Sequence, residues 1–235
     1  MSFVNYAARE ITLKLVYYGP GLSGKTTNVR HLHGGTAEER RGRLIELSTD
    51  EERTLMFDFA PLTVGQIHGF ALRFHVYSVP GQIFYAATRR LIVRGADAVV
   101  FIADSQEARF EANVESLENL EHDLREHFGH PDAVPCVMQY NKRDSPSALS
   151  LAQLQRALNP RHWPEFEAIA AHGFGVQTTS RAAIKLALRA TRAVIGEHVD
   201  GVVAHVGAAG RRAHLVAARA ADAEVDIDAG GRLGA

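Results

Sequence analysis

The sequence predicts an α/β fold in which a mainly parallel sheet has helices on both faces and one antiparallel hairpin at its edge. Two observations lead to this fold class. Apolar, β-branched runs of strand length alternate with longer segments of helical periodicity, which is typical of parallel strands joined by right-handed helical crossovers. The exception is a pair of successive alternating runs, residues 53–62 and 70–79, which only the loop TVGQIHG separates. Two neighbouring strands with so short a connection form an antiparallel hairpin.

The remaining elements follow in chain order. Buried strands are expected where short apolar runs end at turn residues, at residues 11–18, 96–104, 133–140 and 166–170. Helices are expected between and after them, at residues 24–34, 105–128, 150–158 and 175–195. The longest of these has the clearest periodicity, because its apolar side chains recur along one face at Phe110, Val114, Leu117, Leu120 and Leu124.

Residues 1–195 are expected to form one domain, since a chain of 235 residues is long enough for one sizeable core. From Gly196 onward the composition changes to alanine and glycine with scattered large apolar side chains. Such a segment buries too little surface to offset its ordering entropy. Residues 196–235 are therefore predicted to be a mobile C-terminal extension, with a weak helix around residues 211–225 as the alternative.

The composition excludes several classes of function. Lysine plus arginine number 26 and aspartate plus glutamate 27, so no global field attracts nucleic acid or an anionic membrane. Neither a membrane-spanning run nor a leader sequence is apparent, and a cytoplasmic protein is expected. Cys136 is the only cysteine, which excludes an intramolecular disulfide. His31 and His33 are two positions apart on an expected helix and so point to different sides, which argues against a metal site.

Residues 19–26, Gly-Pro-Gly-Leu-Ser-Gly-Lys-Thr, match the phosphate-loop pattern G-x-x-x-x-G-K-[ST] between an expected strand and an expected helix. The alternative is a glycine-rich turn with a chance lysine. In a phosphate loop the backbone N–H groups hold phosphates, Lys25 reaches the β- and γ-phosphates, and the Thr26 hydroxyl binds Mg²⁺. The residues expected to contact the nucleotide here are Gly19, Gly21, Ser23, Gly24, Lys25, Thr26 and Thr27.

The tetrapeptide N-K-R-D, with Asn141, Lys142 and Asp144, follows an expected strand and predicts the base. The carboxylate of Asp144 can accept hydrogen bonds from N1–H and the 2-amino group of guanine, whereas adenine has neither donor. Rejection by such a polar mismatch reaches about 10⁴. Asn141 either bonds the base or holds neighbouring loops together, and the Lys142 stem covers the ring. The phosphate loop and this motif together indicate a guanine nucleotide.

The segment VYSVPGQIFY carries the third motif. The backbone N–H of Gly81 is placed to sense the γ-phosphate, and Gln82 to orient an attacking water. The alternative is a turn with a solvent-facing glutamine.

These three motifs resemble those of Ras-like small GTPases, which have the P-loop NTPase fold. The closer resemblance is to the MglA family of bacterial polarity and gliding-motility GTPases. It covers residues 1 to about 195, through MSFVNYAAREITLKLVYYGPGLSGKTTN, LSTDEERTLMFDF, FHVYSVPGQIFY, ADSQEARFEANVESLENL and QYNKRD.

The resemblance implies further site residues. Ser78 stands where Ras-like proteins have an aspartate that holds a Mg²⁺-bound water and where this branch has threonine. Thr54 is expected to be the switch threonine that binds the nucleotide and Mg²⁺, with Thr49 as the alternative. Arg53 corresponds to the arginine that the family supplies from its own chain to the transferring phosphoryl group. The Ser-Ala-Lys of the base-holding loop is replaced by residues 169–171, where the backbone N–H of Ala170 or Ala171 is expected to meet the guanine O6.

The predicted function is a GTP-binding switch that uses GTP/GDP and Mg²⁺ and hydrolyses GTP slowly, with Gln82 and Arg53 as catalytic residues. The resemblance implies a monomer whose partners are an MglB-type roadblock-fold activator and polarity or motility effectors. It also implies concentration at a cell pole through those partners. A guanine-nucleotide-bound scaffold without useful hydrolysis is the alternative, motivated by Ser78 and the long C-terminal tail. An ATP-dependent kinase or ATPase does not agree with N-K-R-D.

Overall fold

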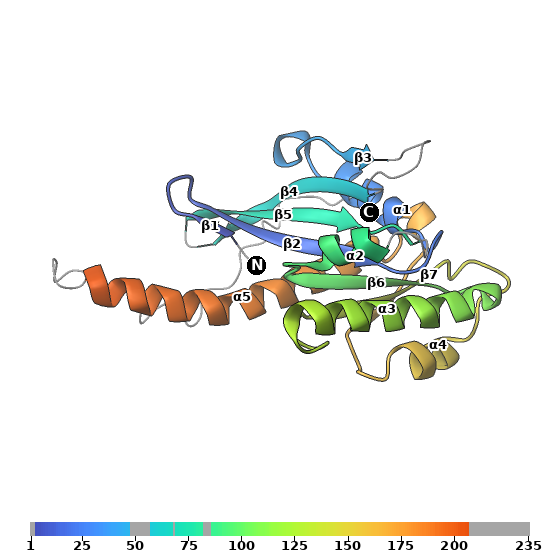
Figure 1. Ribbon diagram of the computed structural model, residues 1–235. Helices are drawn as coiled ribbons and strands as arrows, with labels where there is room; N and C mark the ends of the chain where they lie inside the picture. The colour runs from blue at the N-terminus through green and yellow to red at the C-terminus, as the bar shows by residue number, and fades with distance from the viewer. Residues whose placement is uncertain (1–2, 48–56, 68, 82–85, 207–235) are drawn as a thin grey trace.

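The computed structural model describes residues 3–47, 57–67, 69–81 and 86–206 (Figure 1). Several residues with expected roles therefore lie outside the described residues: Thr49, Arg53, Thr54 and Gln82. Most of the expected C-terminal extension, residues 207–235, also lies outside them.

The strands of the described chain form one mixed sheet. They are β1 (Phe3–Asn5), β2 (Glu10–Tyr18), β3 (Ile45–Leu47), β4 (Phe57–Ile67), β5 (Phe70–Ser78), β6 (Ala98–Asp104), β7 (Cys136–Asn141) and β8 (Glu165–Glu167). Their order across the sheet is β3-β4-β5-β2-β6-β7-β8, with β1 paired to β2. The neighbours from β5 to β8 are parallel, while β4 pairs antiparallel with β5 and with β3. The predicted fold class is confirmed.

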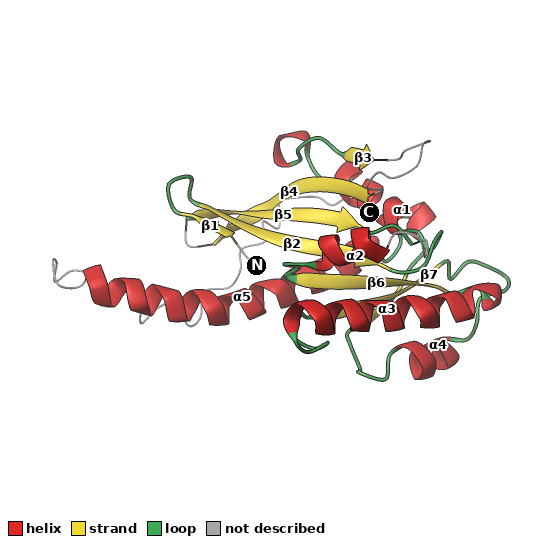
Figure 2. Ribbon diagram, viewed as in Figure 1, coloured by secondary structure: helices red, strands yellow, loops and turns green. Residues whose placement is uncertain are grey.

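Helices cover both faces of this sheet (Figure 2). They are α1 (Lys25–Gly34), α2 (Ala86–Val93), α3 (Phe110–Phe128), α4 (Leu151–Leu158) and α5 (Val176–Val206). Single 3₁₀ turns lie at Glu38–Arg40, Glu107–Arg109 and Ala170–His172. In one core, α1 and α5 pack on the sheet through side chains such as Val29 and Ala183, and in the other α2, α3 and α4 pack through side chains such as Ile92, Leu120 and Leu154.

The predicted apolar face of the 105–128 helix is confirmed. Leu117, Leu120 and Leu124 are buried, and Phe110 and Val114 pack against the same core. The helix begins later than the sequence predicts, because a 3₁₀ turn at Glu107–Arg109 precedes it. It ends at Gly129, whose left-handed backbone is the usual stop signal.

The hairpin is longer than the sequence predicts. β4 runs to Ile67, through most of the segment TVGQIHG that we expected to form the loop. The register shifts between Thr63 and Gly65 in that segment, and the strand continues beyond the shift. A glycine inside a strand commonly marks such a bulge.

The sequence analysis missed α2 for a physical reason. Arg89 of this short helix is buried while Leu91 is 57% exposed, so its pattern inverts the usual amphipathic arrangement. The short strands β1 and β3 were also missed, since three-residue strands carry too little pattern to recognise.

The last helix also differs from the expectation. α5 continues to Val206 and extends past the sheet, whereas the sequence predicted an end near residue 195 (Figure 1). The helix includes Gly196, where the composition changes, because a glycine costs a helix only about 1 kcal/mol. No helix in the described ranges is both long enough and apolar enough to span a membrane.

Candidate functional site: a nucleotide site at the carboxyl ends of the strands

The polar motifs that lie within the described residues meet at one edge of the sheet. β2 lies between β5 and β6. The connection that follows β2 therefore runs to one side of this strand, and the connection that follows β5 crosses to the other side. The phosphate loop follows β2, Ser78 ends β5, Asp104 ends β6 and Asn141 ends β7. Open α/β sheets bind ligands at such a switch point, outside the carboxyl ends of the strands.

Two glycines of the phosphate loop have backbone conformations that other residues rarely adopt. Gly19 has φ 141° and Gly24 has φ 101°. A Cβ at Gly19 would collide with the carbonyl of Ile102, and a Cβ at Gly24 would collide with the amide of Asn141. The loop can therefore lie this close to β6 and β7 only with glycine at both positions.

Lys25 is held in the loop and has an unusual environment. Its ammonium donates hydrogen bonds to the carbonyl oxygens of Gly19 (2.8 Å) and Pro20 (2.6 Å). Burial lowers the pKa of Lys25 to about 7, although Asp58 opposes that shift. An anion beside this ammonium would restore its full charge, so the group is suited to bind phosphate.

The start of α1 is also suited to phosphate. Its first turn, Lys25 to Asn28, has no acidic side chain, so its positive dipole end is not neutralised. Thr26 and Thr27 lie half-buried in this turn. The hydroxyl of Ser23 is fully buried and, among the described residues, has no hydrogen-bond partner. A buried hydroxyl without a partner fits an oxygen ligand at this position.

A carboxylate lies next to Ser78, although Ser78 itself has none. The Ser78 hydroxyl donates to the Asp58 carboxylate at 2.5 Å, and the Asp58 N–H lies 3.3 Å from the same hydroxyl. Asp58 is only 8% exposed and stands directly opposite Ser78 in the antiparallel register of β4 and β5. Sequence analysis missed Asp58. The available signal was a lone aspartate in an apolar strand, but its position opposite Ser78 depends on the longer hairpin and the bulge that the structure shows.

Gly81 lies against the phosphate loop. Its carbonyl accepts a hydrogen bond from the Gly21 N–H at 3.1 Å. A Cβ at Gly81 would collide with the backbone nitrogen of Gly21, so only glycine allows this approach. The predicted contact of the Gly81 N–H with a γ-phosphate stays a prediction.

Asn141 connects the phosphate loop with the base-holding loop. Its amide NH₂ donates to the Ser23 carbonyl at 2.8 Å, and its amide oxygen accepts from the Ala170 N–H at 2.9 Å. The side chain is almost completely buried. Of the two roles considered for Asn141, the contacts favour holding the loops together. Because Ala170 already donates to Asn141, the exposed Ala171 is the better placed donor for a base.

Lys142 and Asp144 have contrasting environments. The Lys142 ammonium bonds the Asp104 carboxylate at 2.7 Å and the Gln106 side chain at 3.3 Å. Asp104 is fully buried, so this contact fixes the lysine stem at the end of β6. Asp144 is exposed, and its carboxylate has no hydrogen bond or ion pair with any residue that the structure describes. It is thus available to a base.

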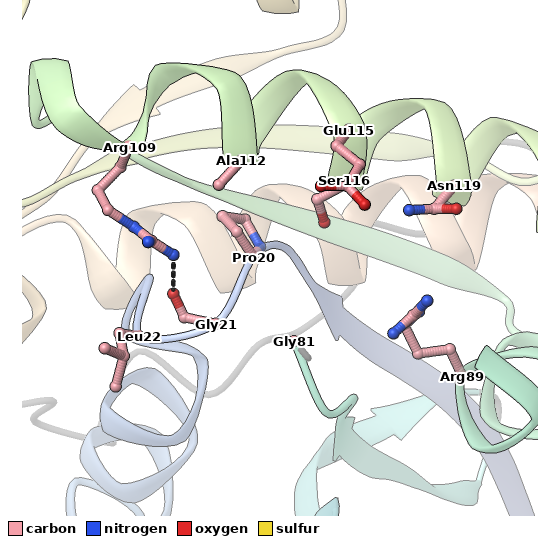
Figure 3. A pocket seen from close by; sticks show the side chains of 10 residues that line it. All are labelled: Pro20, Gly21, Leu22, Gly81, Arg89, Arg109, Ala112, Glu115, Ser116 and Asn119. Carbon is pink, nitrogen blue, oxygen red and sulfur yellow. Dashed lines mark hydrogen bonds between the residues drawn. The ribbon is translucent and has the colours of Figure 1, made fainter. Parts of the chain in front are cut away.

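A cavity of about 410 Å³ lies beside the phosphate loop, between Gly21, Gly81 and the α3 side chains Ser116 and Asn119 (Figure 3). Arg89 and Arg109 also line it. Both arginines lower the pKa of Lys25 through their charge, so they add to the positive potential at this end of the sheet. Sequence analysis did not single out either arginine.

Two comparisons with known proteins give the family of this chain. The model of the ADP-ribosylation factor family matches residues 2–199. The mutual gliding-motility protein MglA of Myxococcus xanthus (strain DK1622) is 55% identical over 188 residues, which make up 80% of this chain and 96% of the M. xanthus protein. Both results confirm the resemblance inferred from the sequence motifs.

Proposed function

Since the chain belongs to the ADP-ribosylation factor family of small GTPases, we propose that it is a guanine-nucleotide switch that hydrolyses GTP slowly and controls cell polarity or gliding motility. The observation that carries the proposal is the convergence of a phosphate loop and N-K-R-D at one edge of the sheet. Asn141 joins the two, and beside them lies the exposed Asp144, whose carboxylate has no partner in the part of the chain that the structure describes.

Each end of the nucleotide has its own residues. The phosphates lie in the loop of residues 19–27, where backbone N–H groups, the α1 N-terminus and Lys25 neutralise their charge. The guanine lies over the Lys142 stem, with its N1–H and 2-amino group donating to Asp144 and its O6 accepting from Ala171. An adenine base would leave Asp144 facing an acceptor, so GTP is expected to bind more tightly than ATP.

The residues near Ser78 fit a magnesium ion. Thr26 and the switch threonine, Thr54, would hold it, and the Asp58 carboxylate would accept hydrogen bonds from its bound water. When bound, Mg²⁺ would neutralise charge on the phosphate oxygens. The hydrogen bond from Ser78 and the attraction between Asp58 and Lys25 support this role, because they hold a carboxylate beside residue 78.

Hydrolysis is assigned to two residues. Gln82 orients a water for attack on the γ-phosphorus, and Arg53 stabilises charge on the transferring phosphoryl group as GDP leaves. An arginine in this role contributes about 10³–10⁵ in rate. Loss of the γ-phosphate removes the contacts to Thr54 and Gly81, so the two surrounding loops change shape and partners read that change.

The partners are proposed from the relative. An MglB-type roadblock-fold activator would act on a monomer by repositioning Arg53 and Gln82, and polarity or motility effectors would bind the GTP form. Localisation to a cell pole would then follow from these partners.

A nucleotide-bound scaffold without useful hydrolysis remains the second candidate, because Ser78 replaces an aspartate. Asp58 argues against the scaffold, because its carboxylate lies opposite Ser78 and accepts a hydrogen bond from the Ser78 hydroxyl.

The test is single-turnover GTP hydrolysis by the wild type and Gln82→Ala, each alone and with a roadblock-domain activator. Gln66→Ala, at an exposed position of β4, is the matched control. Activator-dependent hydrolysis that Gln82→Ala loses and Gln66→Ala keeps would support the switch. Tight GTP binding without hydrolysis under any condition would favour the scaffold.

A further inference from the structure

Leu22 has an unfavourable backbone conformation at the centre of the phosphate loop. Its φ is 65°, in the left-handed region that side chains with a Cβ disfavour. The side chain is 84% exposed, so packing does little to offset that cost. Strained residues of this kind persist only where neighbouring groups hold them in place.

The neighbouring group is Arg109, which ends the 3₁₀ turn before α3. Its guanidinium donates a hydrogen bond to the carbonyl oxygen of Gly21 at 2.8 Å (Figure 3). The N–H of Gly21 donates to Gly81 at 3.1 Å. Both polar groups of Gly21 are therefore held by segments distant in sequence.

The hydrogen bond from Arg109 to the Gly21 carbonyl also orients the N–H of Leu22. The carbonyl of Gly21 and the N–H of Leu22 belong to one planar peptide unit, which is trans because the described chain has no cis peptide bonds. In a trans peptide the C=O and N–H point in opposite directions. With the oxygen held by Arg109, the Leu22 N–H faces away from the arginine, and it has no acceptor among the residues that the structure describes.

The environment of the Arg109 guanidinium favours an anion near the phosphate loop. Its Nε is buried and has no partner within the described chain. Its positive charge lowers the pKa of Lys25, which is the effect of repulsion between two cations. An anion near both groups would offset that repulsion.

We propose that Arg109 is a positioning residue for the nucleotide phosphates: it holds the Gly21–Leu22 peptide so that the Leu22 N–H points at them. This inference rests on the proposed function and deepens it. Arg109 does not touch the nucleotide; it orients a donor that does. The arginine also stabilises the left-handed conformation of Leu22.

The test uses GDP and GMP as probes, because the effect concerns the phosphates beyond the first. Arg109→Met keeps the apolar stem and removes the guanidinium. We expect it to weaken GDP binding by about 10- to 100-fold, the range for a charge-assisted hydrogen bond and its dependent donor. GMP affinity should change by less than about threefold. Arg125→Met, at an exposed position of α3, is the control and should change neither.

A double-mutant cycle with Leu22→Gly separates positioning from charge. Glycine adopts positive φ without strain, so Leu22→Gly should recover at least about threefold of the GDP affinity in Arg109→Met and change the wild type much less. An equal factor in both backgrounds would mean that Arg109 acts through its charge alone, which would overturn the proposal. Equal losses of GDP and GMP affinity, or a GDP loss below about threefold, would overturn it too.

Thermal unfolding of each nucleotide-free variant accompanies the binding measurements, and Arg109→Gln replaces Arg109→Met in the same cycle if the methionine variant does not fold. Wild-type protein without affinity for GDP would overturn the proposed function and this inference together. Wild-type GDP binding that Arg109→Met retains in full would overturn only the role of Arg109.

Discussion

The two edges of the site to which we assign the base and the metal, called here the base-holding edge and the metal edge, are built in different ways. At the base-holding edge, one short motif after β7 provides Asn141, Lys142 and Asp144, and Asn141 organises its surroundings through two side-chain hydrogen bonds. At the metal edge, the carboxylate of Asp58 reaches Ser78 from another strand through the register of β4 and β5. A contiguous motif can be read from sequence, whereas a site built by strand pairing cannot.

The largest expected effect tests the base-holding edge. Asp144→Asn replaces an acceptor with an amide that can donate to a carbonyl at the 2-position of the base, so preference should move from GTP toward xanthosine triphosphate. The change in the ratio of the two affinities should be of order 10⁴. Competition binding with both nucleotides measures it, with Asp132→Asn on a distant surface as the control. A variant that still prefers GTP as the wild type does would show that Asp144 does not read the base.

The next effect concerns the link between the two loops. Asn141→Ala removes both buried hydrogen bonds and leaves the Ser23 carbonyl and the Ala170 N–H unpaired. The free energy of unfolding should fall by about 2–3 kcal/mol. Urea unfolding of the nucleotide-free protein measures it, and Asn119→Ala on α3 is the control. A loss below about 0.5 kcal/mol would mean that Asn141 contacts the base rather than the loops.

At the metal edge, Asp58→Ala should weaken Mg²⁺ binding, so that the Mg²⁺ midpoint, the free Mg²⁺ concentration at which GDP release is half-slowed, rises by about 10- to 100-fold. This is the usual range for a residue that supports a metal from outside its ligand shell. GDP release is measured over a series of free Mg²⁺ concentrations. Glu10→Gln, which breaks an ion pair with Arg73 on the same sheet, is the control. The same Mg²⁺ midpoint in Asp58→Ala and wild type would remove Asp58 from the metal edge.

Ser78→Ala should have the smallest effect. It leaves the Asp58 carboxylate in place and removes only the hydroxyl that orients it, so the Mg²⁺ midpoint should shift by less than about tenfold. The same GDP-release series measures the shift. An effect larger than that of Asp58→Ala would make Ser78, rather than Asp58, the main contributor at this edge.

The sequence predicted much of the fold because the deciding patterns are local. The apolar strands around the phosphate loop and the apolar face of α3 follow from periodicity within single segments. The α2 helix escaped prediction because Arg89 is buried and Leu91 exposed, an inversion that depends on what packs against the helix. The full length of β4 escaped because a bulge, rather than a turn, accommodates Gly65.

The sequence by itself determined the phosphate loop, the base motif and the family, since each is a contiguous string whose residue types and spacing carry the chemistry. Only the tertiary structure decided which donors and carboxylates meet. Three hydrogen bonds depend on it: from the Ser78 hydroxyl to Asp58, from the Ala170 N–H to Asn141, and from Arg109 to the Gly21 carbonyl. These contacts join residues far apart in the chain, and hydrogen bonds depend on distances and angles that strand register and helix packing set.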